Sequence, residues 1–213
     1  MIVINFKNYK TGSEALKLAK QIEKYLPKAI ICPATIDIEL ISQKTKLKVF
    51  SQHADIKEGN KTTGYNTLKT LKKAGISGTL INHSEHPLSA TNIYKTIIVS
   101  KKLKLKSIVC TPTLRNMKMI LTIKKVKPHA IAFEDPKLIS TGKSITKYNP
   151  KALLQFIKIM KKTKIIPLCG AGISTVEDVK QAHALGCKGI LISSAIANNK
   201  NPILLLKELK DFQ

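Results

Sequence analysis

Two side chains that can move protons, a histidine and a glutamate, follow short apolar runs at places where a strand would end. His83 stands in the stretch N-H-S-E at 82–85, and Glu134 follows the apolar run 129–133. A carboxylate that loses its hydration can remove a proton from carbon, because desolvation raises its pKa. A neutral histidine can donate a hydrogen bond to an oxygen of the same substrate. The pair therefore predicts proton transfer on a small molecule.

Groups that bind negative charge stand at the ends of other apolar runs. Lys7 follows the first run together with Asn5 and supplies a fixed positive charge. Gly172, in the turn G-A-G, and the pair Ser193-Ser194 stand where helices would begin. Backbone N–H groups at such turns and helix starts bind a phosphate dianion. Each feature alone could be an ordinary polar turn, so the prediction of a phosphate site depends on their meeting at one place.

The elements that must position these residues alternate along the chain. Short runs rich in Ile and Val predict strands buried on both faces, at 2–6, 29–32, 47–51, 78–82, 106–110, 129–133, 164–169 and 188–192. Between them, apolar spacing and capping residues predict helices, at 13–26, 35–43, 65–74, 87–103, 113–125, 149–162, 175–185 and 201–212. Ser13 and Thr175 are the expected caps of the first and seventh helices.

The repeat predicts an α/β protein with a (β/α)8 barrel. Dividing 213 residues by eight repeats gives about 27 residues each, near the lower limit for this fold. An open doubly wound sheet is the alternative, but it usually has fewer repeats and a G-x-G-x-x-G turn after its first strand. Since no linker or change of composition divides the chain, residues 1–213 are expected to form a single domain. Chemistry in such a barrel gathers at the carboxyl ends of the strands.

The charge balance is strongly basic. Lys and Arg total 37 against 13 Asp and Glu, a formal net charge of +24. Such a balance is compatible with nucleic-acid partners. The lysines are nevertheless scattered along every expected helix and are not interleaved with aromatics, so we expect a lysine-rich, solvated surface and no nucleic-acid partner. No apolar run approaches the roughly 18 residues of a membrane span, and a cytoplasmic protein with four buried, unpaired cysteines and no metal site is expected.

Five motifs, each after its own expected strand, carry a resemblance that covers essentially the whole chain. They are N-F-K at 5–7, N-H-S-E at 82–85, A-F-E-D-P-K-L-I-S-T-G at 132–142, C-G-A-G-I-S at 169–174 and S-S-A at 193–195. In these motifs the chain resembles the triosephosphate isomerases, most closely their short archaeal form. The resemblance implies the TIM barrel and the interconversion of dihydroxyacetone phosphate and D-glyceraldehyde 3-phosphate, a step of glycolysis and gluconeogenesis, without cofactor or metal.

The resemblance also implies roles for residues. Glu134 matches the base that moves a proton between C1 and C2 of the substrate. His83 matches the electrophile that moves protons between the two substrate oxygens through an enediolate. Lys7 matches the cation that stabilises developing negative charge, with Asn5 as its hydrogen-bonding neighbour, and Glu85 matches a supporting acid.

Other matching residues would bind substrate or phosphate, namely Phe6, Ile139, Gly172, Ser193 and Ser194. Residues 135–143 match a lid that closes over the site and excludes water. Thr63-Gly64 resembles a segment that reaches a neighbouring subunit, which implies a homo-oligomer, and the archaeal form favours a tetramer over a dimer.

The chain departs from the family pattern at a few positions. Asp135 stands where a proline usually stiffens the lid, Ser140 replaces a glycine of the lid tip, and His86 stands where an arginine is usual. None of these removes a catalytic group. Two other functions are also compatible with the sequence, namely an isomerase of another small sugar phosphate and a nucleic-acid-binding protein on a barrel without activity.

Overall fold

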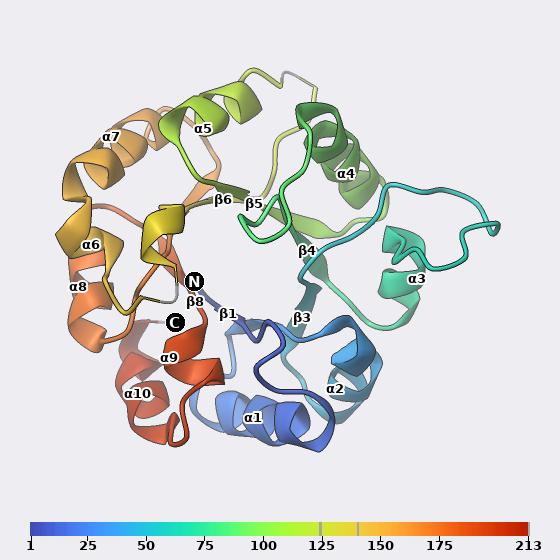
Figure 1. The fold of residues 1–213 in the computed structure, drawn as a ribbon, viewed down its shortest axis with the longest axis horizontal. Coiled ribbons are helices and arrows are strands. Elements are labelled where there is room, and N and C mark those ends of the chain that lie inside the picture. Colours follow the sequence, from blue (N-terminus) through green and yellow to red (C-terminus); the bar gives the residue numbers. More distant parts are fainter. Residues whose placement is uncertain (124, 140, 213) are drawn as a thin grey trace.

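The computed structural model describes residues 1–123, 125–139 and 141–212. Its strands form a closed, parallel barrel in sequence order, in which β1 pairs with both β2 and β8. Figure 1 shows the strands at the centre and the helices around them. The strands are β1 (Ile2–Asn5), β2 (Ile30–Cys32), β3 (Lys48–Ser51), β4 (Gly78–Ile81), β5 (Lys106–Thr111), β6 (Ala130–Phe133), β7 (Ile166–Cys169) and β8 (Gly189–Ile192). The predicted α/β barrel is confirmed.

The core has two layers because successive strand side chains point to opposite sides. Val3, Phe50 and Leu168 belong to a buried cluster that fills the inside of the barrel. Ile2 and Ile4, on either side of Val3, belong to the larger cluster between strands and helices. Both faces of each strand are therefore buried, which is why the strand runs are almost uniformly apolar.

The longer helices run back along the outside of the barrel (Figure 1), so that each starts on the face where the strands end. The helices are α1 (Gly12–Tyr25), α2 (Ile38–Lys44), α3 (Leu68–Lys73), α4 (Ala90–Lys102), α5 (Leu114–Leu121), α6 (Ile145–Tyr148), α7 (Pro150–Met160), α8 (Val176–Ala184), α9 (Ser194–Ala197) and α10 (Ile203–Glu208). Short 3-10 turns are η1 (Thr35–Asp37), η2 (Pro136–Leu138) and η3 (Leu209–Phe212).

The helix predictions hold in place and order, with differences at the ends. Thr175 and Asp178 form the expected capping box of α8. The prediction of Ser13 as the first cap is wrong, since the helix already begins at Gly12 and Thr11 precedes it. The short helices α6 and α9 and the turn η2 were not predicted, because three or four residues are too few to show a helical period.

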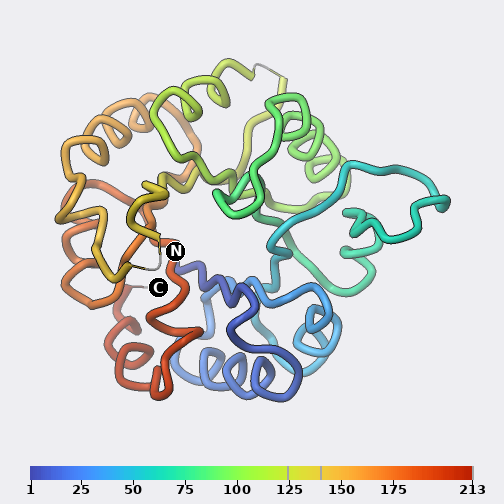
Figure 2. The backbone as a smooth tube through the Cα atoms, in the orientation of Figure 1, coloured from blue at the N-terminus to red at the C-terminus, as the bar shows by residue number. Residues whose placement is uncertain are grey.

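The segment between β3 and α3 leaves the barrel and extends outward, as Figure 2 shows. Two hydrogen bonds between Asp55 and Asn66 hold its base. The Asp55 N–H donates to the Asn66 carbonyl at 2.9 Å, and the Asp55 carboxylate accepts from the Asn66 N–H at 2.7 Å. Thr63 and Gly64 lie along this extension. The four cysteines are free and buried, as expected. Within the described ranges, no helix is long and apolar enough to cross a membrane.

Candidate active site

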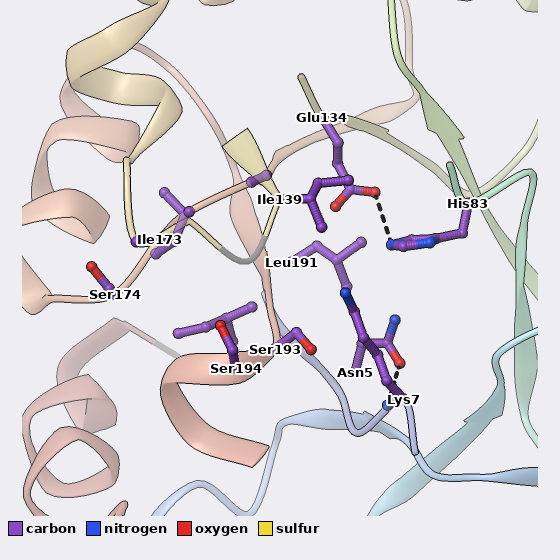
Figure 3. Close-up of a pocket in the computed structure, with 14 residues that line it drawn as sticks. Asn5, Lys7, His83, Glu134, Ile139, Ile173, Ser174, Leu191, Ser193 and Ser194 are labelled. Atoms are coloured by element: carbon purple, nitrogen blue, oxygen red, sulfur yellow. Dashed lines mark hydrogen bonds and ion pairs between the residues drawn. The ribbon is translucent and has the colours of Figure 1, made fainter. Parts of the chain in front are cut away.

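Side chains from the ends of several strands line one hollow on the face where the strands end (Figure 3). The lining residues are Asn5, Lys7, His83, Glu134, Ile139, Gly142, Ala171, Gly172, Ile173, Ser174, Leu191, Ile192, Ser193 and Ser194. Most of the residues predicted for the site therefore meet. Phe6 does not line the hollow, because its side chain is fully buried in the core. Glu85 lies at the edge, with its side chain about half exposed.

The end of β4 fixes the orientation of His83. The backbone N–H of Glu85 donates to His83 Nδ1 at 3.2 Å, so Nδ1 is the acceptor and the proton of the neutral ring lies on Nε2. Asn82 turns the chain here with φ at 61°. Its side chain holds that turn by donating to the Cys110 carbonyl and accepting from the Leu88 N–H. The result is an imidazole that presents an N–H donor to the hollow.

Glu134, at the end of β6, faces that donor. Its Oε2 lies 3.9 Å from His83 Nε2, and only 6% of the residue is exposed. Burial raises the pKa of the Glu134 carboxyl, and the neighbouring His83, Cys110 and Lys7 oppose that rise. Oε2 has no hydrogen-bond partner among the described residues. A poorly hydrated carboxylate with an unengaged oxygen is suited to take a proton from carbon.

Gly170 leaves room for the Glu134 carboxylate. A Cβ at position 170 would lie 2.9 Å from Glu134 Oε1 and 3.0 Å from the Leu191 carbonyl oxygen. Both distances are below ordinary van der Waals contact, so any side chain here would displace the carboxylate. The first glycine of the G-A-G turn is thus required for packing against Glu134. The motif C-G-A-G-I-S contains this glycine, but its contact with Glu134 joins two distant segments and is not visible in the sequence.

The end of β1 holds Lys7 in an uncommon conformation, with φ at 47°. Asn5 Oδ1 accepts from the Lys7 N–H at 3.0 Å. Gln52 Nε2 donates to the Lys7 carbonyl at 2.8 Å and to the Cys32 carbonyl at 3.1 Å. Lys7 Nζ pairs with Glu85 Oε1 at 2.5 Å. Asn5 and Gln52 therefore set the backbone of Lys7, and Glu85 holds its charged end.

The opposite side of the hollow is built from backbone. Gly172 has φ at 70°, and a Cβ there would lie 1.9 Å from the Lys143 carbonyl oxygen. Ser194 is the first residue of α9, preceded by Ser193. Backbone N–H groups at a helix start have no intrahelical acceptor. In Figure 3, Ser193, Ser194 and Ile173 lie across the hollow from the His83–Glu134 pair. The two sides could hold the two ends of a short phosphorylated molecule.

The segment 135–143 begins with a small hydrogen-bonded turn. Asp135 Oδ1 accepts from the Lys137 N–H at 3.1 Å and caps η2. Asp135 Oδ2 accepts from Asn149 Nδ2 at 3.0 Å. Asp135 thus fastens the start of this segment to the residue before α7, at the position where the family usually has a proline. Ser140, the departure noted in the lid tip, lies outside the described residues.

Comparisons with known proteins agree with this geometry. The sequence model of the family described as "Triosephosphate isomerase" matches residues 1–209. The chain belongs to the triosephosphate isomerase family. It is 36% identical to the triosephosphate isomerase of Methanobrevibacter smithii, over 98% of the chain and 96% of that protein. It is 35% identical to that of Methanocaldococcus jannaschii, over 100% and 99%, and 37% identical to that of Saccharolobus solfataricus, over 95% and 91%. Triosephosphate isomerases are aldose–ketose isomerases, and the expected resemblance to archaeal members is confirmed.

Proposed function

We propose that this chain interconverts dihydroxyacetone phosphate and D-glyceraldehyde 3-phosphate in the hollow at the strand ends. The observation that carries the proposal is the pairing of a buried Glu134 carboxylate with the His83 Nε2–H donor, 3.9 Å apart. This is the arrangement that a carbon-to-carbon proton transfer beside a carbonyl needs. The family membership and the full-length similarity to triosephosphate isomerases support it.

The steps follow from the groups present. Glu134 takes a proton from C1 of dihydroxyacetone phosphate, while His83 Nε2–H donates to the C2 carbonyl oxygen. The electron pair of the broken C–H bond forms the C1–C2 double bond of an enediolate, whose negative charge Lys7 stabilises. His83 Nε2 gives its proton to the oxygen on C2 and takes the proton from the hydroxyl on C1, which restores the neutral ring. Glu134 returns the carbon-bound proton to C2, which leaves an aldehyde at C1 and a hydroxyl at C2. Each step uses protein groups alone.

Binding of the phosphate would use the opposite side of the hollow. The N–H groups near Gly172, Ser193 and Ser194 are suited to a dianion. Ile139, which lines the hollow, would lie against the substrate when the segment 135–143 closes over it. Closure would exclude water, strengthen the electrostatic interactions within the site and protect the enediolate.

The direct test is a coupled assay of glyceraldehyde 3-phosphate isomerisation by the purified chain. Fast turnover that a Glu134→Gln variant loses would support the proposal, and an inactive but folded wild type would contradict it. The same assay with other small aldose phosphates measures specificity. Turnover of a different sugar phosphate at a higher kcat/KM would replace the substrate named here.

We further propose that residues 1–213 act as one domain within a homo-oligomer, a tetramer rather than a dimer, in the cytoplasm. The outward extension between β3 and α3, which carries Thr63 and Gly64, supports an intersubunit role. Light scattering after size-exclusion chromatography measures the mass directly. Deletion of residues 60–65 should shift the mass toward the monomer, and an unchanged oligomer would contradict the role of this segment.

A further inference from the structure

The lysines that are scattered along the sequence gather in space on the face where the strands begin. All the outer helices run in the same direction, so their last turns meet at this face. Each of α1, α2, α3, α4, α5, α7 and α10 has lysine in its last turn. The starts of the strands add further basic residues, namely Lys48, Lys106, His129, Lys164 and Lys188. We refer to this side of the barrel as the strand-start face.

Acidic residues are concentrated on the other side. Glu134 and Glu85 lie at the active site, and Glu14, Glu39 and Glu177 lie in first helical turns. Those close to the strand-start face are Glu23, Glu208 and Asp211. Ion pairs such as those of Lys10 with Glu14 and Lys147 with Asp178 lie toward the active-site face. The positive charge of the strand-start face is therefore largely uncompensated by acidic side chains.

Helix dipoles account for only part of this distribution. The C-terminus of a helix carries roughly half a negative charge, which one lysine in the last turn more than offsets. The basic residues at the strand starts and in the segments before them are additional. First turns are not acidic to the same extent, since α3, α4, α5, α7 and α10 have no acid there.

A basic hollow lies within this face, between the end of α4 and the starts of β5, β6 and β7. It has a volume of about 340 Å³. Its basic lining residues are Lys101, Lys104, Lys106, Lys127, His129 and Lys164, and no acidic residue lines it within the described ranges. Burial, Lys106 and Lys48 lower the pKa of His129. Lys106 and Lys48 thus act electrostatically on a side chain that lines this hollow.

We propose that the strand-start face binds the phosphate backbone of duplex nucleic acid, independently of base sequence. The basic residues extend well beyond the hollow, from Lys48 to Lys188, which suits a long polyanion better than a single phosphate. Affinity from lysine–phosphate contacts alone needs no base recognition. The exposed tyrosines, Tyr65 and Tyr148, lie toward the active-site face. Tyr25, in the last turn of α1, lies on the strand-start face but is only partly exposed, with Lys24 and Lys207 over its ring. Within the described ranges this face therefore offers no fully exposed tyrosine on which single-stranded bases would stack.

A second copy of the chain is a poor occupant, since two faces of like charge repel each other. Nucleic acid bound at this face would leave the active site open, because the two faces lie at opposite ends of the barrel. Isomerase turnover should continue in the complex. The proposal also concerns a different surface from the proposed isomerase site, and binding is measured without any assay of activity.

The test is fluorescence anisotropy with a labelled 20-base-pair duplex of mixed sequence, titrated with the full chain at 50 to 200 mM KCl. The test variant is Lys101→Gln/Lys106→Gln/Lys164→Gln in the basic hollow. The matched control, Lys69→Gln/Lys151→Gln/Lys200→Gln, removes the same charge from the active-site side. Circular dichroism and unfolding of both variants would verify the fold.

We expect the wild-type affinity to fall steeply with salt. The slope of log K against log salt should become shallower by roughly 0.9 for each phosphate contact removed in the test variant. Its affinity should fall at least tenfold, and that of the control less than twofold. Equal losses in both variants would overturn the proposal, since they would indicate non-specific attraction to the net charge. Equal competition by tripolyphosphate at the same phosphate concentration, or a preference for anionic vesicles, would overturn it in favour of a small anion or a membrane.

Discussion

His83 Nε2 lies 3.9 Å from Glu134 Oε2, although the two residues come from the ends of β4 and β6 and are not neighbours in the barrel. The gap is longer than a hydrogen bond, so the two groups face each other without being bonded. A substrate carbon and its oxygen could engage both. The Glu85 N–H donates to His83 Nδ1 and orients the ring, and Gly170 leaves space for the Glu134 carboxylate.

Replacing the Glu134 carboxylate tests this arrangement. Glu134→Gln keeps the shape and removes the base, so kcat should fall by about 10²- to 10⁴-fold, the usual contribution of a general base. The variant should be at least as stable as the wild type at pH 7.5, because an amide avoids the burial of a charge that raises the pKa of Glu134. Steady-state kinetics and urea unfolding measure the two effects. A destabilised variant would mean that activity is lost through the fold.

Gly170→Ala tests whether the position of the carboxylate matters. The added methyl group would lie 2.9 Å from Glu134 Oε1 and should push the carboxylate aside. A shift of about 1 Å can cost roughly 10²-fold in rate, so we expect kcat to fall more than KM rises. Gly12→Ala is the control for backbone strain without displacement of the carboxylate, because Gly12 has φ at 56° but a Cβ there meets nothing within 4 Å. Equal kinetics of Gly170→Ala and wild type would show that the site tolerates the displacement.

The sequence predicted the barrel well because its strands are buried on both faces. After an exposed lysine at the first position, the runs 106–110 and 188–192 are buried throughout, and β5 and β8 form within one residue of them. Several residues that line the hollow were also recognisable in the sequence, because a polar residue directly after such a run stands out. His83 and Glu134 were recognisable in this way, and their meeting follows from the parallel closure of the barrel.

Positioning contacts between segments distant in sequence could not be predicted. Gln52 holds the Lys7 backbone from the end of β3, and no pattern in its own segment indicates that contact. Phe6 belongs to a binding motif, yet its side chain packs into the core. The lysines were read as scattered, because a linear sequence does not show that all helix ends meet on one face. These features depend on register and direction, which exist only in the closed fold.

The contact between Asp135 and Asn149 predicts a coupling in the lid. Asp135→Ala removes the hydrogen bonds to the Lys137 N–H and Asn149 Nδ2, and Asn149→Ala removes only the second. One hydrogen bond contributes about 0.5–1.5 kcal/mol, so each variant should lower kcat/KM by up to roughly tenfold. The double variant should then be close to Asp135→Ala alone. Additive losses in this double-mutant cycle would show that the two residues act separately.

Stability should fall as the pH is lowered from 7.5 to 5.5, because burial lowers the pKa values of His53, His129 and His183 in the folded chain. Well above about pH 6.5, the ordinary pKa of histidine, each ring is neutral in both the folded and the unfolded chain and does not change the free energy of unfolding. Below that value the unfolded chain binds protons first, so the free energy of unfolding decreases until the folded chain is protonated too. The pKa of Glu134 is raised in the folded chain, so its protonation at lower pH increases the free energy of unfolding and opposes the effect of the histidines.

His53→Gln isolates one of these groups. The His53 ring stacks on His86 at 3.8 Å between centroids, and His86 further lowers its pKa, while Asp55 at 3.4 Å raises it. Urea unfolding at pH 7.5 and 5.5 should therefore show a smaller loss of stability for His53→Gln than for the wild type. His86→Gln should act in the same direction, because it removes the neighbour that opposes protonation of His53. An identical loss in all three proteins would assign the pH dependence to groups outside this pair.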